Sequence, residues 1–304
     1  MTKTRIPTKL IFIAVIAVAL LLPRTAAAKD IFDRDNLVAW CIVPFDAKKR
    51  TPPQRAEMLQ KLGIHRFAYD WRAEHLPTFE TELNELKKHN IELTAVWFPA
   101  DLNSDARLLL DAIKKHELHP QLWVMMQIKP QADQNKTIAS TATAIGPVAI
   151  EAAKLNCRVA LYNHGGWFGE PENQIAIIES LRKEGITNVG MVYNLHHGHE
   201  HLGRFWELLT KMKPYLLALN LNGMSKDGER TGKKILPLAQ GELDLQLLKI
   251  IREAGYSGPI GILNHTDEDA EGRLMDNLDG LDWLVAKLNG KDPGPAPKPR
   301  TYRP

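Results

Sequence analysis

The chain has 304 residues, of which 25% are charged and 44% hydrophobic, and its formal net charge is +3. The first 28 residues contain four basic and no acidic residues, so without them 35 basic residues face 36 acidic ones, a net charge of −1. A nearly neutral chain without a basic block excludes nucleic-acid recognition as its main role.

Residues 1–28 have the pattern of a secretory signal peptide. Basic residues precede the apolar run at 10–22, and three alanines at 26–28 offer a site for signal peptidase. The run is shorter than the ~20 residues that a membrane-spanning helix needs. We therefore predict export to the periplasm or the extracellular space, with an uncleaved N-terminal membrane anchor as the alternative. We expect no membrane span in the mature chain.

Eight short apolar runs rich in β-branched and aromatic residues follow, and they begin at residues 37, 66, 92, 121, 158, 188, 216 and 259. Their spacing of about thirty residues is the length of a strand, a helix and two loops. Segments with helical apolar spacing or helix-terminating signals lie between them, at 52–62, 77–90, 138–155, 171–184, 243–254 and 272–288. The alternation predicts a single-domain (β/α)8 TIM barrel over residues 29–290 with parallel strands.

Two smaller features complete the outline of the chain. The Pro-rich segment at 291–304 predicts a disordered tail. Cys41 and Cys157 lie in different strand-like runs, and we expect two buried thiols rather than a disulfide.

Polar and aromatic residues gather where the predicted strands end, which is the face of a TIM barrel that carries its chemistry. We expect a pocket there. Its candidate residues at the strand ends are Trp40, Asp70, Trp97, Gln127, Lys129, Asn163, His164, Asn194, His196, His197, Asn220, Asn222, Asn264 and His265. Trp71, Trp167 and Glu242 join them from the adjoining loops.

Three stretches resemble the sugar phosphate isomerase/epimerase-like proteins, a family with a xylose isomerase-like TIM barrel. They are YNHGGW at 162–167, NLHHGHE at 194–200 and ILPLAQGELDLQLLKIIREAGYSGPIGI at 235–262. The resemblance spans nearly the whole mature chain. It implies a divalent metal held by Glu, Asp, His and Glu at the ends of strands five to eight, and proton transfer between neighbouring carbons of a hydroxy-ketone.

The chain departs from that family at the implied metal ligands. Tyr162 stands at the position of the first Glu, Asn194 at that of the Asp, and Asn220 or Asn222 at that of the His, while residues 262–265 contain no Glu. An Asn carbonyl is a weak, neutral ligand for a divalent cation. The carboxylate half of the family's metal site is therefore missing.

One enzymatic interpretation keeps a metal and changes its ligands to imidazoles, which suit Zn, Co or Ni, with Mn as a further candidate. The predicted ligands are His164, His196, His197 and His265. The alternative for each histidine is a neutral hydrogen-bond donor to substrate or a supporting role. We expect His199 and His201 to begin a helix and to face solvent.

A second enzymatic interpretation needs no metal. Lys129, Glu242, His164 and His197, together with Asp70, would then supply the acid and base groups for proton transfer next to a carbonyl. The competing structural roles are a helix cap for Glu242, a solvated loop position for Lys129, and a buried pair with Arg72 for Asp70.

A third interpretation is a catalytically inactive carbohydrate-binding barrel. Asn and His side chains bond hydroxyls in both directions, and Trp rings offer flat faces to sugars, although each Trp can equally belong to the core. The predicted substrate-binding residues are Trp40, Asp70, Trp97, Gln127, Asn163, Trp167, Asn194, Asn220, Asn222 and Asn264. We predict an exported isomerase/epimerase-like enzyme, or a keto-sugar lyase or hydratase, acting on a small-molecule carbohydrate, with the inactive binding protein as the alternative.

Overall fold

Eight parallel strands pair in chain order, and the last strand, β8 (Ile260–Leu263), closes onto the first, β1 (Leu37–Trp40). This closed barrel appears in a computed structural model that describes residues 30–301, so the predicted signal peptide lies outside the described residues. Contacts divide the chain into Met1–Asp30 and Ile31–Pro304, and the helices and strands described below all belong to the second unit. Among residues 30–301, no helix has both the length and the apolar character needed to cross a bilayer.

All eight predicted strands are present, each beginning within one residue of its apolar run. The later residues of each run leave the sheet and form the loops at the carboxyl ends. The strands are β1 (Leu37–Trp40), β2 (Arg66–Tyr69), β3 (Glu92–Phe98), β4 (Gln121–Val124), β5 (Arg158–Tyr162), β6 (Val189–Asn194), β7 (Leu216–Leu221) and β8 (Ile260–Leu263).

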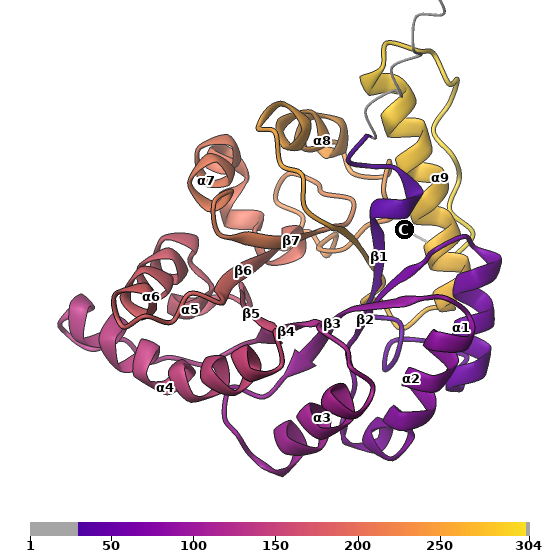
Figure 1. The fold of residues 1–304 in the computed structure, drawn as a ribbon. Coiled ribbons are helices and arrows are strands. Elements are labelled where there is room, and N and C mark those ends of the chain that lie inside the picture. Colours follow the sequence, from indigo (N-terminus) through magenta and orange to yellow (C-terminus); the bar gives the residue numbers. More distant parts are fainter. Residues whose placement is uncertain (1–29, 302–304) are drawn as a thin grey trace, which may run out of the picture. The chain divides into compact units, whose positions relative to one another are not determined.

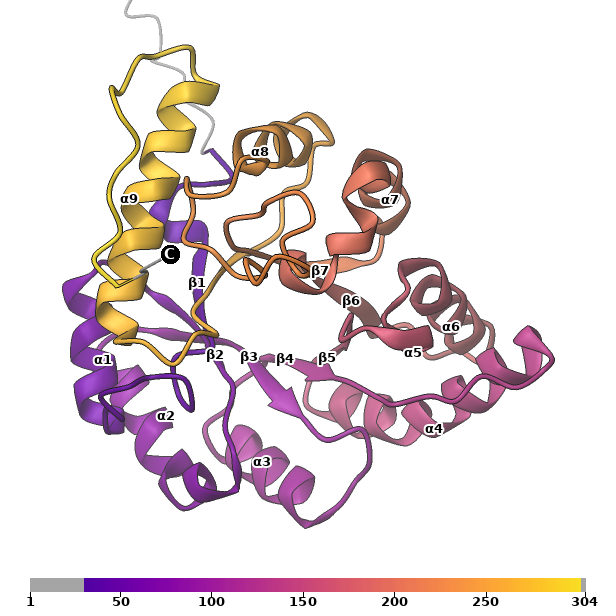
Figure 2. The same cartoon turned by 180° about the vertical axis from the view of Figure 1, so that it is seen from behind.

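Helices surround the strands on the outside of the barrel, as Figures 1 and 2 show from opposite sides. They are α1 (Pro52–Lys61), α2 (Phe79–Lys88), α3 (Ser104–Lys115), α4 (Gln134–Lys154), α5 (Gly166–Gly169), α6 (Pro171–Lys183), α7 (Phe205–Met212), α8 (Asp244–Glu253) and α9 (Ala270–Leu288). Short 3-10 turns lie at Arg34–Asn36, Ala73–Thr78, Leu195–His197 and His199–Arg204. The predicted (β/α)8 barrel is confirmed.

Three helices begin two or more residues away from their predicted positions, and one of them, α9, begins at Ala270 instead of residue 272. α2 begins at Phe79, because the residues before it form the 3-10 turn that contains Pro77. α4 begins four residues earlier than predicted, at Gln134. Asp133 caps it there, since its Oδ1 accepts a hydrogen bond from the N–H of Asn135 at 2.9 Å.

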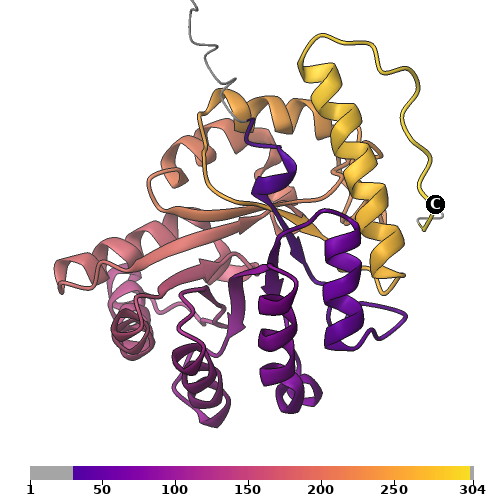
Figure 3. The same cartoon turned by 45° about the vertical axis from the view of Figure 1, so that its right-hand side comes forward.

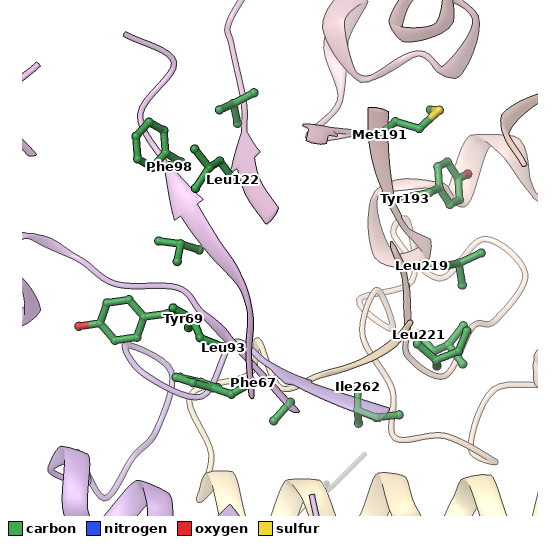
Figure 4. Packing of buried hydrophobic residues seen from close by; sticks show 14 of the residues in the cluster. Phe67, Tyr69, Leu93, Phe98, Leu122, Met191, Tyr193, Leu219, Leu221 and Ile262 are labelled. Carbon is green, nitrogen blue, oxygen red and sulfur yellow. The ribbon is translucent and has the colours of Figure 1, made fainter. Parts of the chain in front are cut away.

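The alternation of side chains along the strands builds two cores. Outward-facing residues such as Phe67, Tyr69 and Tyr193 pack between the barrel and the helices (Figure 4). Inside the barrel, Trp40 packs edge-on against Trp123 with ring centroids 4.7 Å apart. Small residues on four strands make room for these large rings: Ala68, Ala95, Ala160 and Ala218.

The structure also places the two cysteines and the described part of the C-terminal tail. Cys41 and Cys157 are free and buried, which confirms the predicted thiols. Residues 291–301 form no helix or strand, yet they run back alongside α9 (Figure 3). Arg300 pairs there with Asp276 on α9 at 2.9 Å. The described part of the tail is thus anchored to α9, which its Pro-rich composition did not indicate.

Candidate functional site

A small cavity of about 60 Å³ lies at the carboxyl ends of the strands, and we call it the inner cavity. Six of the predicted site residues line it: Trp40, Asp70, Trp97, His164, His197 and His265. A wider space of about 500 Å³, the outer cleft, shares His164 with it. Gln127, Lys129 and Trp167 line the outer cleft. The strand ends therefore bring most of the predicted aromatic and ionisable groups together around these two spaces, a region that we call the mouth of the barrel.

Asp70 is the carboxyl group of the inner cavity. It follows β2 and is only 2% exposed. Its Oδ1 accepts a hydrogen bond from the N–H of Val43 at 3.3 Å, whereas its Oδ2 has no partner among the described residues. Burial raises the pKa of Asp70 to about 7, although the nearby Arg72 opposes that rise. Asp70 is thus an acid that gains and loses its proton near neutral pH with one oxygen free.

The histidines form a cluster across the mouth from Asp70. The ring of His197 lies 4.4 Å from that of His164 and 3.7 Å from that of His196, measured between centroids. Burial lowers the pKa of His197 to about 3, and it also lowers the pKa values of His164 and His265. These imidazoles are neutral at physiological pH, so they offer N–H donors rather than positive charge.

His196 occupies a different position from the other three histidines. It is 1% exposed and does not line the inner cavity. Neither of its ring nitrogens has a hydrogen-bond partner among the described residues. Burial holds the pKa of His196 well below its usual range, so this ring is neutral and lies behind His197.

The mouth does not fit the predicted metal as its residues stand. Among residues 30–301, no group of three or more His, Cys, Asp or Glu side chains is arranged to hold a metal ion. One of the four predicted ligands, His196, does not line the inner cavity. A metal held by His164, His196, His197 and His265 stays a prediction, and the chemistry below comes from the side chains alone.

Three of the asparagines predicted to bind substrate form hydrogen bonds with one another instead. Asn163 Oδ1 accepts hydrogen bonds from the backbone N–H of Asn194 at 2.8 Å and from its Nδ2 at 2.9 Å. Asn220 Nδ2 donates to Asn194 Oδ1 at 2.6 Å. All three are buried at the ends of β5, β6 and β7. We call them the Asn ladder, and it joins neighbouring strands instead of lining the inner cavity or the outer cleft.

Asn222 and Asn264 also bond the protein itself. Asn222 Nδ2 donates to the carbonyl of Gly223 at 2.8 Å, in the long loop after β7. Asn264 Nδ2 donates to the carbonyl of Ala270 at 3.0 Å, at the start of α9. Both side chains order loops around the mouth without lining either cavity.

Glu242 and Lys129, both predicted as catalytic, are exposed. Glu242 Oε1 accepts a hydrogen bond from the N–H of Lys226 at 2.9 Å, within the loop after β7. The first-turn carboxylate of α8 that orders this loop is Asp244, which accepts from the N–H of Met224 at 2.6 Å. Lys129 remains near the site through the outer cleft, whereas Glu242 lines neither space.

Four lining residues of the inner cavity were not predicted: Cys41, Phe45, Arg72 and Tyr162. Each follows or ends a strand, and that position was the available signal. Arg72 lies two residues beyond Asp70, and its Nη1 donates to the carbonyls of Asp70 and Trp71 at 2.8 Å each. Arg72 therefore forms a hydrogen bond to the backbone carbonyl of Asp70 instead of the predicted ion pair with its carboxylate.

The expectation that His201 faces solvent is wrong. His201 is 5% exposed, and its Nδ1 lies 2.9 Å from the hydroxyl of Tyr193. Its Nε2 lies 3.2 Å from the carboxylate of Glu170. His199, half-buried, contacts the carbonyl of Lys234 at 3.0 Å. His199 begins the 3-10 turn His199–Arg204, as predicted, and both histidines order the loops after β5, β6 and β7.

Known proteins resemble the chain in fold rather than in sequence. No protein-family model matches it, and no curated protein is similar enough in sequence to count as a relative. The crystal structure of the IolI protein with a bound zinc atom has a TM-score of 0.64 at 14% identity, covering 82% of this chain and 98% of that one. A xylose isomerase domain-containing protein from Salmonella typhimurium has a TM-score of 0.62 at 11% identity, with 84% and 98% covered.

D-psicose 3-epimerase from Clostridium cellulolyticum H10, solved with D-tagatose, has a TM-score of 0.56 at 14% identity, covering 83% of this chain and 98% of that one. Identities this low establish the fold and leave the substrate open. The chain has the fold of the xylose isomerase-like TIM barrels, as the sequence resemblance implied.

Proposed function

We propose that this chain is an exported sugar isomerase or epimerase in which Asp70 moves a proton next to a carbonyl group. The observation that carries the proposal is the Asp70 carboxyl, buried beside the inner cavity with one unpartnered oxygen. A pKa of about 7 suits a group that must both take and return a proton at neutral pH. Structural neighbours that are sugar epimerases support a carbohydrate as substrate.

The barrel gives the reacting sugar a defined place. Strands pair in chain order around a closed ring of eight, so β2 and β6 stand on opposite sides. Asp70 follows β2 and His197 follows β6, and both line the inner cavity. A keto-sugar held between them has its acidic C–H bond toward the carboxylate and its carbonyl toward the imidazoles.

The proposed reaction begins with proton transfer from the sugar to Asp70. The Asp70 carboxylate takes the proton from the carbon next to the carbonyl, and the C–H electron pair forms an enediolate. The neutral N–H groups of His164 and His197 donate hydrogen bonds to the oxygen that gains negative charge. Return of the proton to the former carbonyl carbon isomerises the sugar, provided that the hydroxyl proton of the first carbon passes to the former carbonyl oxygen. Epimerisation at the same carbon would need a second acid on the opposite face of the enediolate, because Asp70 can return its proton only on its own side.

Aromatic side chains complete the cavity. Trp40 packs beneath the mouth, and its Nε1 donates to the hydroxyl of Tyr162 at 3.3 Å. Trp97 lies edge-on to Tyr162, with ring centroids 5.0 Å apart. These rings offer apolar faces to the C–H side of a sugar and limit the water that reaches the enediolate. Lys129, Gln127 and Trp167 would contact the part of the substrate that extends into the outer cleft.

Turnover by matched variants tests the proposal. The substrates are D-fructose, D-psicose, D-tagatose and the keto-sugar acid D-fructuronate, with products followed by NMR. Asp70→Asn keeps the acceptor for Val43 but removes the base, so we expect kcat to fall by about 100-fold or more. Asp111→Asn, an exposed carboxylate on α3, should turn over like the wild type. Full activity in Asp70→Asn would contradict the assignment.

The second candidate is a sugar-binding protein without catalysis, favoured by the absence of carboxylates at the family's metal positions. Saturable quenching of tryptophan fluorescence by a keto-sugar, with no turnover of any of the four sugars, would establish it.

The proposed export has its own test. Mass spectrometry of the protein secreted by a host cell should find an N-terminus near residue 29, whereas an intact N-terminus in the membrane fraction would contradict it.

A further inference from the structure

The charged groups around the mouth are unbalanced. Arg72 in the inner cavity and Lys129 in the outer cleft are cationic, and Asp70 is the one carboxyl group among the lining residues of the two spaces. Among residues 30–301, neither cation lies within ion-pair distance of a carboxylate. Two further charged groups influence the lining histidines: Lys234, which is paired with Glu229, acts on His164 and His197, and Asp267 acts on His265. Both Arg72 and Lys129 are exposed to solvent, and together they add positive charge at the openings of the two spaces.

Arg72 is held in place while part of its guanidinium stays free. Its Nη1 donates to the carbonyls of Asp70 and Trp71, at 2.8 Å each. Its Cζ lies 5.3 Å from the ring centroid of Phe45. These contacts fix the plane of the guanidinium, and its Nε and Nη2 have no partner among the described residues. A planar, fixed pair of N–H groups fits two oxygens of a carboxylate or phosphate.

We propose that the substrate of this site carries an anionic oxygen group, a carboxylate or a phosphate, that binds Arg72 at the edge of the inner cavity. This inference rests on the proposed function and narrows its substrate class to acidic keto-sugars. The anion anchors one end of the sugar at Arg72, beside Asp70 and Phe45, and this contact sets which carbon lies at the carboxyl of Asp70. Lys129 adds positive potential along the outer cleft.

A matched ligand series tests the proposal by isothermal titration. D-fructose is neutral, D-fructuronate carries a carboxylate and D-fructose 6-phosphate a phosphate. We expect at least one of the two acidic sugars to bind about 10-fold more tightly than D-fructose, with an affinity that falls as salt rises. The acidic sugar that binds more tightly identifies the anionic group.

Two arginine variants separate recognition from structure. Arg72→Gln keeps an amide donor for the carbonyls but loses the charge. It should weaken the binding of the tighter acidic sugar by about 10-fold or more. The affinity for D-fructose should change less than about 2-fold. Arg107→Gln, an exposed arginine on α3, should change neither. Equal affinities for the three sugars, no binding of either acidic sugar, or equal losses for all ligands in Arg72→Gln would overturn the proposal. Proton transfer by Asp70 is judged separately, by turnover in Asp70→Asn.

Discussion

The buried carboxyl of Asp70 makes the free energy of unfolding depend on pH. Its pKa is raised from the ordinary value of 3.8 to about 7, so the folded chain holds the proton more tightly than the unfolded chain does. The resulting stabilisation is present below pH 4 and is lost as pH rises through 7. Five ionisable groups interact with this carboxyl: Cys41, Arg55, Tyr69, Arg72 and Tyr162. A buried carboxyl that weakens the fold at neutral pH is typical of a functional residue.

Stability measurements on Asp70→Asn test this property. Between pH 5 and pH 8 the wild type should lose about 1–3 kcal/mol more unfolding free energy than the variant, since each pKa unit is worth ~1.4 kcal/mol. Urea unfolding at the two pH values measures the difference. Asp244, whose pKa burial also raises to about 7, is common to both proteins and cancels. Parallel losses in the two proteins would show that Asp70 does not titrate in this range.

The sequence located part of the mouth at the level of single residues. Trp40, Asp70 and His197 were predicted because they follow apolar runs, and they line the inner cavity. Cys41 was missed as a lining residue because its backbone turns there with a φ of 60°, which alternation along a strand does not reveal. Arg72 was missed because a loop side chain that folds back over the mouth leaves no periodic signal.

At the level of elements, the Asn ladder shows what strand register adds to the sequence. Asn194 and Asn220 are partners in the pairing of β6 with β7, and this register brings their amides together. From sequence alone, an Asn at a strand end can face a ligand or a neighbouring strand. Only the relative stagger of β5, β6 and β7 decides between them. The ladder fixes the ends of the strands that lead into His164 and His197.

Gly261 on β8 gives the ladder its space. A Cβ on this residue would overlap with the side-chain amide of Asn220. We therefore expect Gly261→Ala to destabilise the protein by about 1–3 kcal/mol, and the added substitution Asn220→Ala to cost less than its separate effect predicts. Thermal or urea unfolding of the single and double variants measures this coupling. A Cβ on Gly203 meets nothing within 4 Å, so Gly203→Ala is the matched control. Strict additivity of the two changes would contradict the proposed contact.

At the scale of the whole molecule, the closed barrel was predictable because each of its eight units repeats the same apolar strand at about thirty-residue spacing. The anchoring of the tail was not predictable. It depends on Arg300, whose guanidinium reaches Asp276 and Asp279 on α9. Such an ion pair between distant parts of the chain has no local signature in a Pro-rich segment.

Metal removal tests whether the mouth acts through its own side chains. Because the described residues hold no group arranged as metal ligands, we expect dialysis against a chelator to leave turnover and melting temperature unchanged. Elemental analysis before and after dialysis measures any bound metal. Stoichiometric metal that is lost together with activity, and that is also missing from a His164→Ala/His197→Ala variant, would instead establish the predicted histidine site.

The central claim is that Asp70 removes a proton from the carbon next to a sugar carbonyl. Exchange of that hydrogen for solvent deuterium reports this step directly, even where the product returns to the starting sugar. In D₂O, the wild type stripped of metal should exchange the hydrogen in at least one of the four sugars, followed by proton NMR. Asp70→Asn should slow the exchange by about 100-fold or more. Equal exchange rates in the two proteins, or no exchange by the wild type, would contradict the claim.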